Sequence, residues 1–133
     1  MSRGQPRPVT IERVEGAWPD PGPGATRLIR RVHDLRRAPI RELRVEDLRI
    51  LVSQRVSVTV LRRRVMAELD EDPLVSGDLH PGDLLVAVLR AAVALELADR
   101  GRLSEVVERI DPGESARVPA EAWREIRELV GRL

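Results

Sequence analysis

Aromatic side chains are almost absent from this sequence. Phe and Tyr do not occur, and Trp18 and Trp123 are the only aromatic residues. Any hydrophobic core must therefore be built from Leu, Val, Ile and Ala, which pack well between helices. The 133 residues suffice for one domain. A domain of this size buries roughly two thirds of its unfolded surface, so we expect a core that folds without covalent cross-links.

The composition also restricts the cellular compartment in which the protein is expected and the kinds of site that it can form. The chain has no cysteine, which excludes disulfides, thiolate metal sites and cysteine nucleophiles. No apolar run approaches the roughly 20 residues that span a bilayer. Residues 1–8 lack the apolar centre of a secretory signal. We therefore expect a cytoplasmic protein with no membrane partner.

The first 24 residues are expected to form a mobile or loosely packed arm. Residues 16–24 read GAWPDPGPG, and the three prolines and three glycines exclude helix or central strand. We expect Trp18, the apolar residue of this segment, to hold it against the rest of the protein. Residues 25–133 then form the helical domain.

Apolar residues recur at helical spacing along that domain. The first helix ends before Pro39 and should bury a stripe formed by Leu28, Ile29, Val32 and Leu35. A later helix has Pro81 in its first turn and stops at Gly101. The other helices are predicted over residues 45–54, 57–70, 103–110 and 119–133. The fold class is thus all-α: a single compact bundle of about six helices with a Pro/Gly-rich N-terminal arm.

Residues 56–61 fit two kinds of structure. Valine alternates with polar residues at positions 56–60, as in a strand. The same segment also begins a helical stripe that continues through Leu61, Val65 and Leu69. The helical pattern covers more residues, so we predict a helix with Ser57 as its N-cap.

The sequence offers few groups for catalysis. It contains no GxGxxG, Walker, GxSxG or HExxH motif. We expect His33 to be partly buried and hydrogen-bonded. The spacing of Asp78, His80 and Asp83 would allow a metal site, but each has a turn or capping role that explains it without metal. We therefore predict no enzymatic activity, no catalytic residue, no metal and no cofactor.

Six carboxylates occur between residues 68 and 83 with no arginine or lysine among them. The first four lie at the end of a predicted helix, where the helix dipole favours cations. The three arginines just before them, residues 62–64, can offset some of this charge through pairs such as Arg64 with Glu68. Such a cluster indicates either a solvated helix end or an acidic surface for a basic partner. The candidate partner-binding residues are these carboxylates and two nearby arginines: Glu68, Asp70, Glu71, Asp72, Asp78, Asp83, Arg62 and Arg63.

Three segments resemble the immunity proteins of bacterial contact-dependent growth inhibition (CDI) systems. They are VHDLRRAPIREL (32–43), VEDLRILVSQ (45–54) and DEDPLVSGDLHPGDLLVAVL (70–89), and the likeness ends before Gly101. Proteins of this class are encoded beside a toxin, bind its C-terminal toxic domain in the cytosol and block it without catalysis. The resemblance therefore implies a cognate toxin domain as the partner. Because immunity proteins against nucleases are often acidic, the net charge of +1 leaves the toxin's activity open.

The leading hypothesis is thus a protein that neutralises a toxin by occluding its active or substrate-binding site. The alternative is a helix-turn-helix nucleic-acid-binding regulator, with Arg62, Arg63 and Arg64 on a groove-reading helix. The acidic residues that follow and the scarcity of aromatics disfavour nucleic acid as a partner. We expect a monomer rather than a homo-oligomer, because a small domain needs its apolar surface for its own core.

Overall fold

The computed structural model describes residues 7–95 and 100–133 of the chain. Over these residues it is helical, with eight α-helices, one short 3₁₀ helix and no strand beyond two isolated bridges. The predicted all-α class is confirmed, with more helices than the six expected. No described helix combines the length and apolarity needed to cross a bilayer. Residues 1–6 of the predicted arm and residues 96–99, near the end of the helix predicted to stop at Gly101, lie outside the described residues.

The chain divides into two compact units, Met1–Leu43 and Arg44–Leu133. The first contains α1 (Ile11–Glu15), α2 (Arg27–Arg37) and the 3₁₀ helix η1 (Ile40–Glu42). This division falls later in the chain than the predicted limits, 1–24 for the arm and 25–133 for the domain. Those limits stay a prediction.

Side-chain caps begin both helices of the first unit. Thr10 Oγ1 accepts a hydrogen bond from the Arg13 amide at 3.0 Å, and Thr26 Oγ1 accepts one from the Ile29 amide at 3.2 Å. Between α1 and α2, residues 16–26 are neither helix nor strand, as the prolines and glycines predict. Ile11 is fully buried, so this part of the predicted arm is packed.

The apolar stripe of α2 is only half buried. Val32 and Leu35 are buried as predicted, but Leu28 and Ile29 are 42% and 51% exposed, so their predicted burial is wrong. The helix that packs against α2 in this unit is α1, which has five residues. Such a short helix covers only part of a stripe that is about two turns long.

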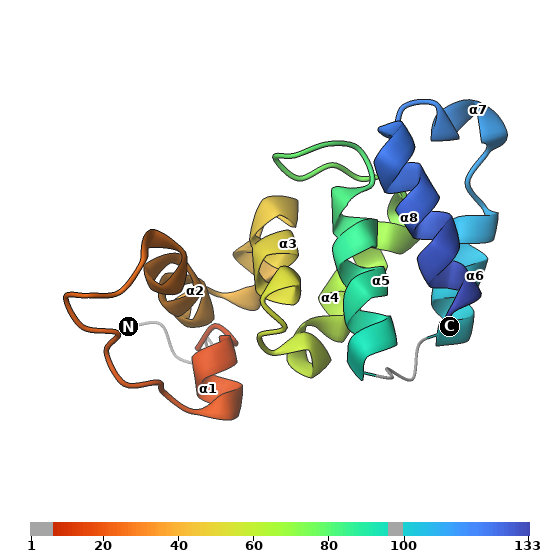
Figure 1. Ribbon diagram of the computed structural model, residues 1–133. Coiled ribbons are helices and arrows are strands. Elements are labelled where there is room, and N and C mark those ends of the chain that lie inside the picture. The colour runs from red at the N-terminus through yellow and green to blue at the C-terminus, as the bar shows by residue number, and fades with distance from the viewer. Residues whose placement is uncertain (1–6, 96–99) are drawn as a thin grey trace. The chain divides into compact units, whose positions relative to one another are not determined.

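The second unit is built around α5 (Asp83–Leu95). This helix packs between α3 (Val45–Ser53) and α8 (Ala120–Gly131), as Figure 1 shows. A helix enclosed on several sides must be apolar almost all round. Accordingly, the buried hydrophobic residues of α5 are Leu84, Leu85, Val86, Ala87, Val88, Leu89, Ala91 and Ala92.

Helix α4 (Val58–Glu71) begins within the ambiguous segment, so residues 58–61 are helical. The predicted helix is confirmed, and the alternative strand does not form. Arg55 and Ser57 both have left-handed backbone conformations, with φ of 55° and 56°, and these reverse the chain. Ser57 occupies the N-cap position as predicted, although its side chain makes no capping hydrogen bond.

Two predicted helix limits need correction, and one short helix was not predicted. Helix α5 begins at Asp83 because Gly82 has a φ of +83°, and Pro81 stays outside the helix in a bridge to Ser76. Gly101 does not end a helix but lies inside α6 (Arg100–Glu108). A short helix, α7 (Pro112–Ser115), follows it, capped by Asp111.

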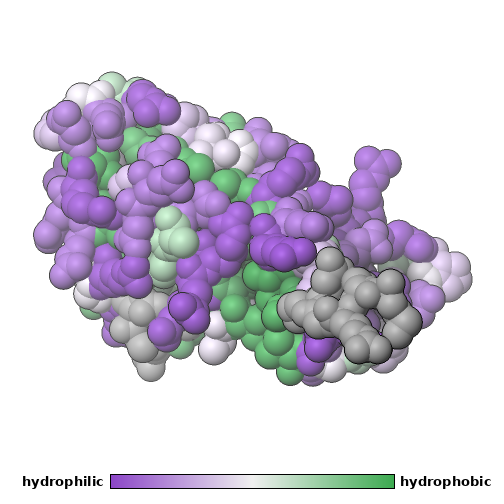
Figure 2. All heavy atoms as spheres, turned by 180° about the vertical axis from the view of Figure 1, so that it is seen from behind, coloured by the Kyte–Doolittle hydropathy of each residue, from purple (hydrophilic) through white to green (hydrophobic). Residues whose placement is uncertain are grey.

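Charged residues make up 34% of the sequence, and they dominate the surface. On the face drawn in Figure 2, hydrophilic residues cover most of the area, and hydrophobic residues reach the surface between them.

Candidate partner-binding site

The carboxylates at the end of α4 are partly neutralised by arginines. Glu68 pairs with Arg64 one turn earlier on the same helix. Asp70 pairs with Arg102 of α6 and lies 3.5 Å from Arg109 Nη2. A hollow of about 170 Å³ lies beside these side chains, lined also by Glu105.

These arginines supply the positive charge that the end of α4 requires. Arg109 Nη1 also donates to the main-chain oxygen of Asp70, at 3.5 Å. Cations at a helix C-terminus are stabilised by the helix dipole, so α6 offsets the acidic residues of α4. Arg102 and Arg109 are 32 and 39 residues away in sequence from Asp70, which is why local inspection of the acidic run finds no such compensation.

Three of the predicted carboxylates are exposed: Glu71, Asp72 and Asp78. Asp72 also shapes the chain, because its Oδ1 accepts a hydrogen bond from the Leu74 amide at 3.0 Å. The predicted arginines, Arg62 and Arg63, lie earlier on α4 and are exposed as well. The structure thus leaves negative charge at the end of α4 and on the connection to α5, which we call the 73–82 loop.

Asp83 has a different place from the other carboxylates. Asp83 as a whole is 3% exposed, and the oxygens of its side chain accept hydrogen bonds from the loop backbone. Oδ1 accepts from the Gly77 amide at 2.6 Å, and Oδ2 accepts from the Leu79 and His80 amides at 3.0 and 3.4 Å. Asp83 therefore acts inside the protein and offers no surface to a partner.

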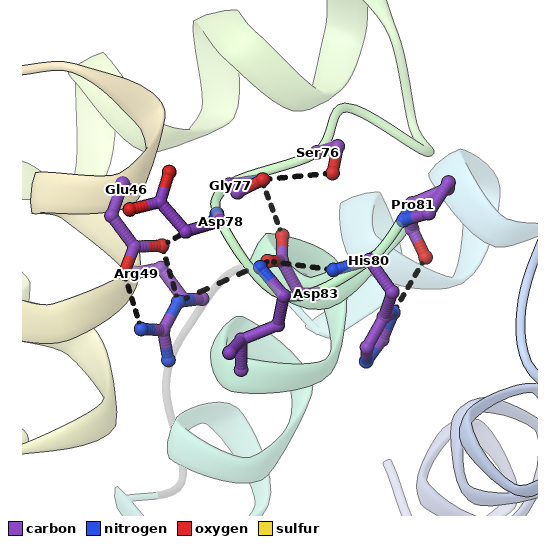
Figure 3. Close-up of polar contacts among 9 residues, drawn as sticks. Glu46, Arg49, Ser76, Gly77, Asp78, His80, Pro81 and Asp83 are labelled. Atoms are coloured by element: carbon purple, nitrogen blue, oxygen red, sulfur yellow. Dashed lines mark hydrogen bonds and ion pairs between the residues drawn. The ribbon is translucent and has the colours of Figure 1, made fainter.

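Glu46 holds the same loop from the opposite side. Its Oε1 accepts a hydrogen bond from the Asp78 amide at 2.9 Å, and both its oxygens accept from Arg49, at 2.6 and 2.5 Å. Arg49 Nε also lies 3.9 Å from Asp83 Oδ2. Figure 3 shows the two carboxylates on either side of the guanidinium, beneath the loop. We call Glu46, Arg49 and Asp83 the charged cluster.

The charged cluster shifts the pKa values of its members. The hydrogen bond from Arg49 lowers the pKa of Glu46, against the opposing effect of burial. The hydrogen bond to Glu46 raises the pKa of Arg49 for the same reason. Two carboxylates face one guanidinium, and the remaining negative charge is balanced by loop amides and by the N-terminus of α5, where Asp83 is the first residue.

Further contacts fix the path of the 73–82 loop. The Gly82 amide donates to the Leu74 oxygen at 3.0 Å, and Ser76 forms an antiparallel bridge with Pro81. At Gly77 a Cβ atom would lie 2.5 Å from Glu46 Oε1, so only glycine fits against the carboxylate. On this fixed loop Leu79 is 64% exposed.

The histidines show no metal-binding arrangement. His80 Nδ1 lies 2.8 Å from the Pro81 oxygen and donates to it. His33 is partly buried as predicted, but its Nε2 has no hydrogen-bond partner among the described residues. Over residues 7–95 and 100–133, no three His, Cys, Asp or Glu side chains are grouped as a metal site would require.

The first unit contains a separate hollow of about 250 Å³, which opens beside Trp18. The Trp18 ring packs on Arg36, a residue of α2 that is only 1% exposed. The charged residues around this hollow are of both signs: Asp20, Asp34, Arg30 and Arg37, together with His33. The mixture indicates no single ligand chemistry.

Sequence inspection missed Glu46 and Arg49 as site residues. Glu46 lies in the first turn of α3, where a carboxylate is explained by the helix dipole alone, and its contact with Asp78 spans 32 residues. The available signal was the three-residue spacing of Glu46 and Arg49, which places the two side chains on one helix face.

Comparison with protein families gives one finding. A family model of CDI immunity proteins matches residues 12–106, a stretch that includes the charged cluster and the 73–82 loop. Comparison with curated proteins finds no match. Neither comparison supports the helix-turn-helix alternative.

Proposed function

The chain belongs to the family of CDI immunity proteins, and from this premise we propose that it binds the toxic C-terminal domain of a cognate toxin in the cytosol. Binding would occlude the active or substrate-binding site of that domain. The observation that carries the proposal is the family match over residues 12–106. Inhibition by occlusion requires surface complementarity only, and the described residues supply both charged and apolar surface.

We place the partner-binding surface at the end of α4 and on the 73–82 loop. Glu71, Asp72 and Asp78 are exposed there, and Glu68 and Asp70 border them with their arginine partners. Arg62 and Arg63 extend this surface along α4. Asp83 contributes from the interior by holding the loop backbone. An acidic surface would match a cationic active site or substrate channel, and it would speed encounter with the toxin.

Growth rescue tests the proposed function. The toxic C-terminal domain encoded beside this protein's gene would be induced in cells with and without the full-length chain. We expect restored growth and a one-to-one complex that co-purifies. If the folded and abundant protein neither restores growth nor binds the domain, the proposed function is overturned for this pair.

The acidic surface is tested by removing charge without removing hydrogen-bond acceptors. We expect the triple variant Glu71→Gln, Asp72→Asn, Asp78→Asn to bind the toxin domain more weakly. Exposed ion pairs contribute roughly 0.2–1 kcal/mol each, so the loss of three corresponds to about tenfold in Kd at low salt. The difference should shrink at high salt because exposed charges are screened.

A matched control carries the same charge change elsewhere. Glu114, Glu121 and Glu128 are exposed on α7 and α8. Their triple replacement by glutamine should leave the Kd unchanged. If both triple variants bind the toxin domain equally weakly, the affinity depends on net charge alone. The assignment of the partner-binding surface to the end of α4 would then be wrong.

A further inference from the structure

Leu79 has the largest exposed fraction of the large hydrophobic residues in the described part of the chain, at 64%. Single exposed leucines are common and need no explanation by themselves. Leu79 differs because its backbone is held in place. Its amide donates to Asp83 Oδ2 at 3.0 Å, and the amides on either side donate to Glu46 and again to Asp83.

The charged cluster that holds this loop is costly to bury. Glu46 and Asp83 are 9% and 3% exposed, and Arg49 is 17% exposed in its side chain. Buried charges lose hydration, and well-packed apolar residues often replace such groups without loss of stability. The hydrogen bonds of this cluster converge on four consecutive amides, at residues 77–80. Its direct effect is therefore to fix one exposed stretch of backbone.

We infer that the 73–82 loop docks into the toxin domain, with Leu79 as its apolar anchor and Glu46 and Asp83 as positioning residues. This inference rests on the proposed function and adds to it the element that makes the central contact. Energetically dominant interface residues are apolar or aromatic groups that fill pockets at the centre of the interface, surrounded by a polar rim.

The charges around Leu79 define the partner's surface. Asp78 precedes Leu79 directly, and Asp72 is the residue before the loop, at the end of α4, and both are exposed. A complementary surface has an apolar socket with cationic side chains at its edge. The loop therefore fits a basic toxin domain, rather than a second copy of itself, which would bring Asp78 close to its own equivalent.

A fixed loop also lowers the cost of binding. Ordering a mobile loop at an interface consumes binding free energy, and a loop that is already ordered avoids that loss. Replacement of Asp83 or Glu46 should therefore weaken the affinity for the toxin domain, even though neither side chain would contact that domain.

Leu79→Ala tests the anchor. Leu79 is exposed, so its truncation should leave the melting temperature unchanged. We expect the Kd for the neighbouring toxin domain to rise at least tenfold, because hot-spot truncations cost about 2 kcal/mol or more. Leu95 of α5, 45% exposed, provides the matched control, and Leu95→Ala should change the Kd by less than twofold.

Asp83→Asn tests the positioning role separately. The amide group can accept fewer of the three loop hydrogen bonds, so the amides of Gly77 and Leu79 should lose protection from hydrogen exchange. We expect the Kd to rise in parallel while α3 and α8 keep their exchange protection. Loss of loop protection with an unchanged Kd would show that the loop is not the docking element and would overturn the inference.

The outcomes separate the two proposals. If the wild-type protein forms no complex, the proposed function fails and the inference fails with it. If the wild-type complex is tight and Leu79→Ala binds equally well, only the inference fails. A wild-type dimer that Leu79→Ala abolishes, with toxin binding unchanged, would assign the loop to self-association and would also overturn the inference.

Discussion

The guanidinium carbon of Arg36 lies 3.9 Å from the centroid of the Trp18 ring. Arg36 Nη2 also donates to the Gly16 oxygen at 2.8 Å, and Glu15 Oε1 lies 3.9 Å from the same nitrogen. One side chain of α2 thus holds both the start of the Pro/Gly-rich segment and its tryptophan. A cation over an indole ring gains energy when it is shielded from water, as Arg36 is.

Arg36→Met should therefore release residues 16–24 from α2. The loss of the cation–π contact and of the charged hydrogen bond should cost about 1–3 kcal/mol. The measurement is acrylamide quenching of Trp18 fluorescence, in a Trp123→Phe background so that a single tryptophan reports. Quenching should increase in Arg36→Met and stay unchanged in Arg27→Ala, which alters an exposed residue of the same helix.

The pKa of Glu46 predicts how stability depends on pH. Because Arg49 lowers this pKa below its ordinary value of 4.5, folding favours the ionised carboxylate. Its contribution to the free energy of unfolding is fully present above pH 4.5 and is lost as the pH falls through the lower, folded-state pKa.

Glu46→Gln removes this dependence and provides the test. In urea unfolding, the wild type should be more stable than the variant at pH 7 by about 1.5–3 kcal/mol, the usual value for hydrogen bonds to charged groups. The difference should shrink as the pH falls below 4.5 and through the lower, folded-state pKa of Glu46. A difference that persists unchanged at low pH would contradict the assignment of the pKa to the Arg49 contact.

Two glycines of the second unit should respond to alanine in opposite directions. Gly101 lies in α6, and a Cβ there would meet nothing within 4 Å. Gly101→Ala should raise the free energy of unfolding by about 0.5–1 kcal/mol, because glycine weakens helices. Gly82 has a φ of +83°, and its Cβ would lie 3.4 Å from Leu74 Cδ2, so Gly82→Ala should lower it. Thermal unfolding of the two variants, each compared with the wild type, measures whether the stability changes in these opposite directions.

Arg90 and Glu125 connect α5 to α8 through two hydrogen bonds, at 2.5 and 2.6 Å. This pair lowers the pKa of Glu125 and raises that of Arg90. Since the Arg90 side chain is 58% exposed, a double-mutant cycle with Arg90→Gln and Glu125→Gln should give a coupling energy of about 0.5 kcal/mol. At 1 M NaCl the coupling should fall close to zero. A large, salt-independent coupling would contradict this.

Helices with complete apolar periodicity could be predicted from the sequence. The apolar patterns of α4 and α5 depend only on residues within each helix. Both helices form over the segments in which the leucines and valines recur at helical spacing. Burial was harder to predict, as Leu28 shows. Periodicity indicates that residues share a face, but the extent of burial depends on the length of the neighbouring helix.

The candidate site depended more on distant contacts. A turn or capping role for Asp83 was visible from its position next to Pro81 and Gly82, and the structure gives it three loop amides. The roles of Arg102 and Glu46 were not visible, because each acts on residues more than 30 positions away. Ion pairs between separate helices have no sequence spacing that would reveal them.

The hydrogen bonds that shape the 73–82 loop end on backbone amides, which every residue except proline possesses. The side chains of Asp78 and Leu79 are therefore not what keeps the loop in its path, whereas a side chain at Gly77 would collide with Glu46. Replacement of Asp78 or Leu79 therefore leaves the backbone hydrogen bonds to Glu46 and Asp83 in place. Under the proposed function, a change of partner and the maintenance of the loop would depend on different residues.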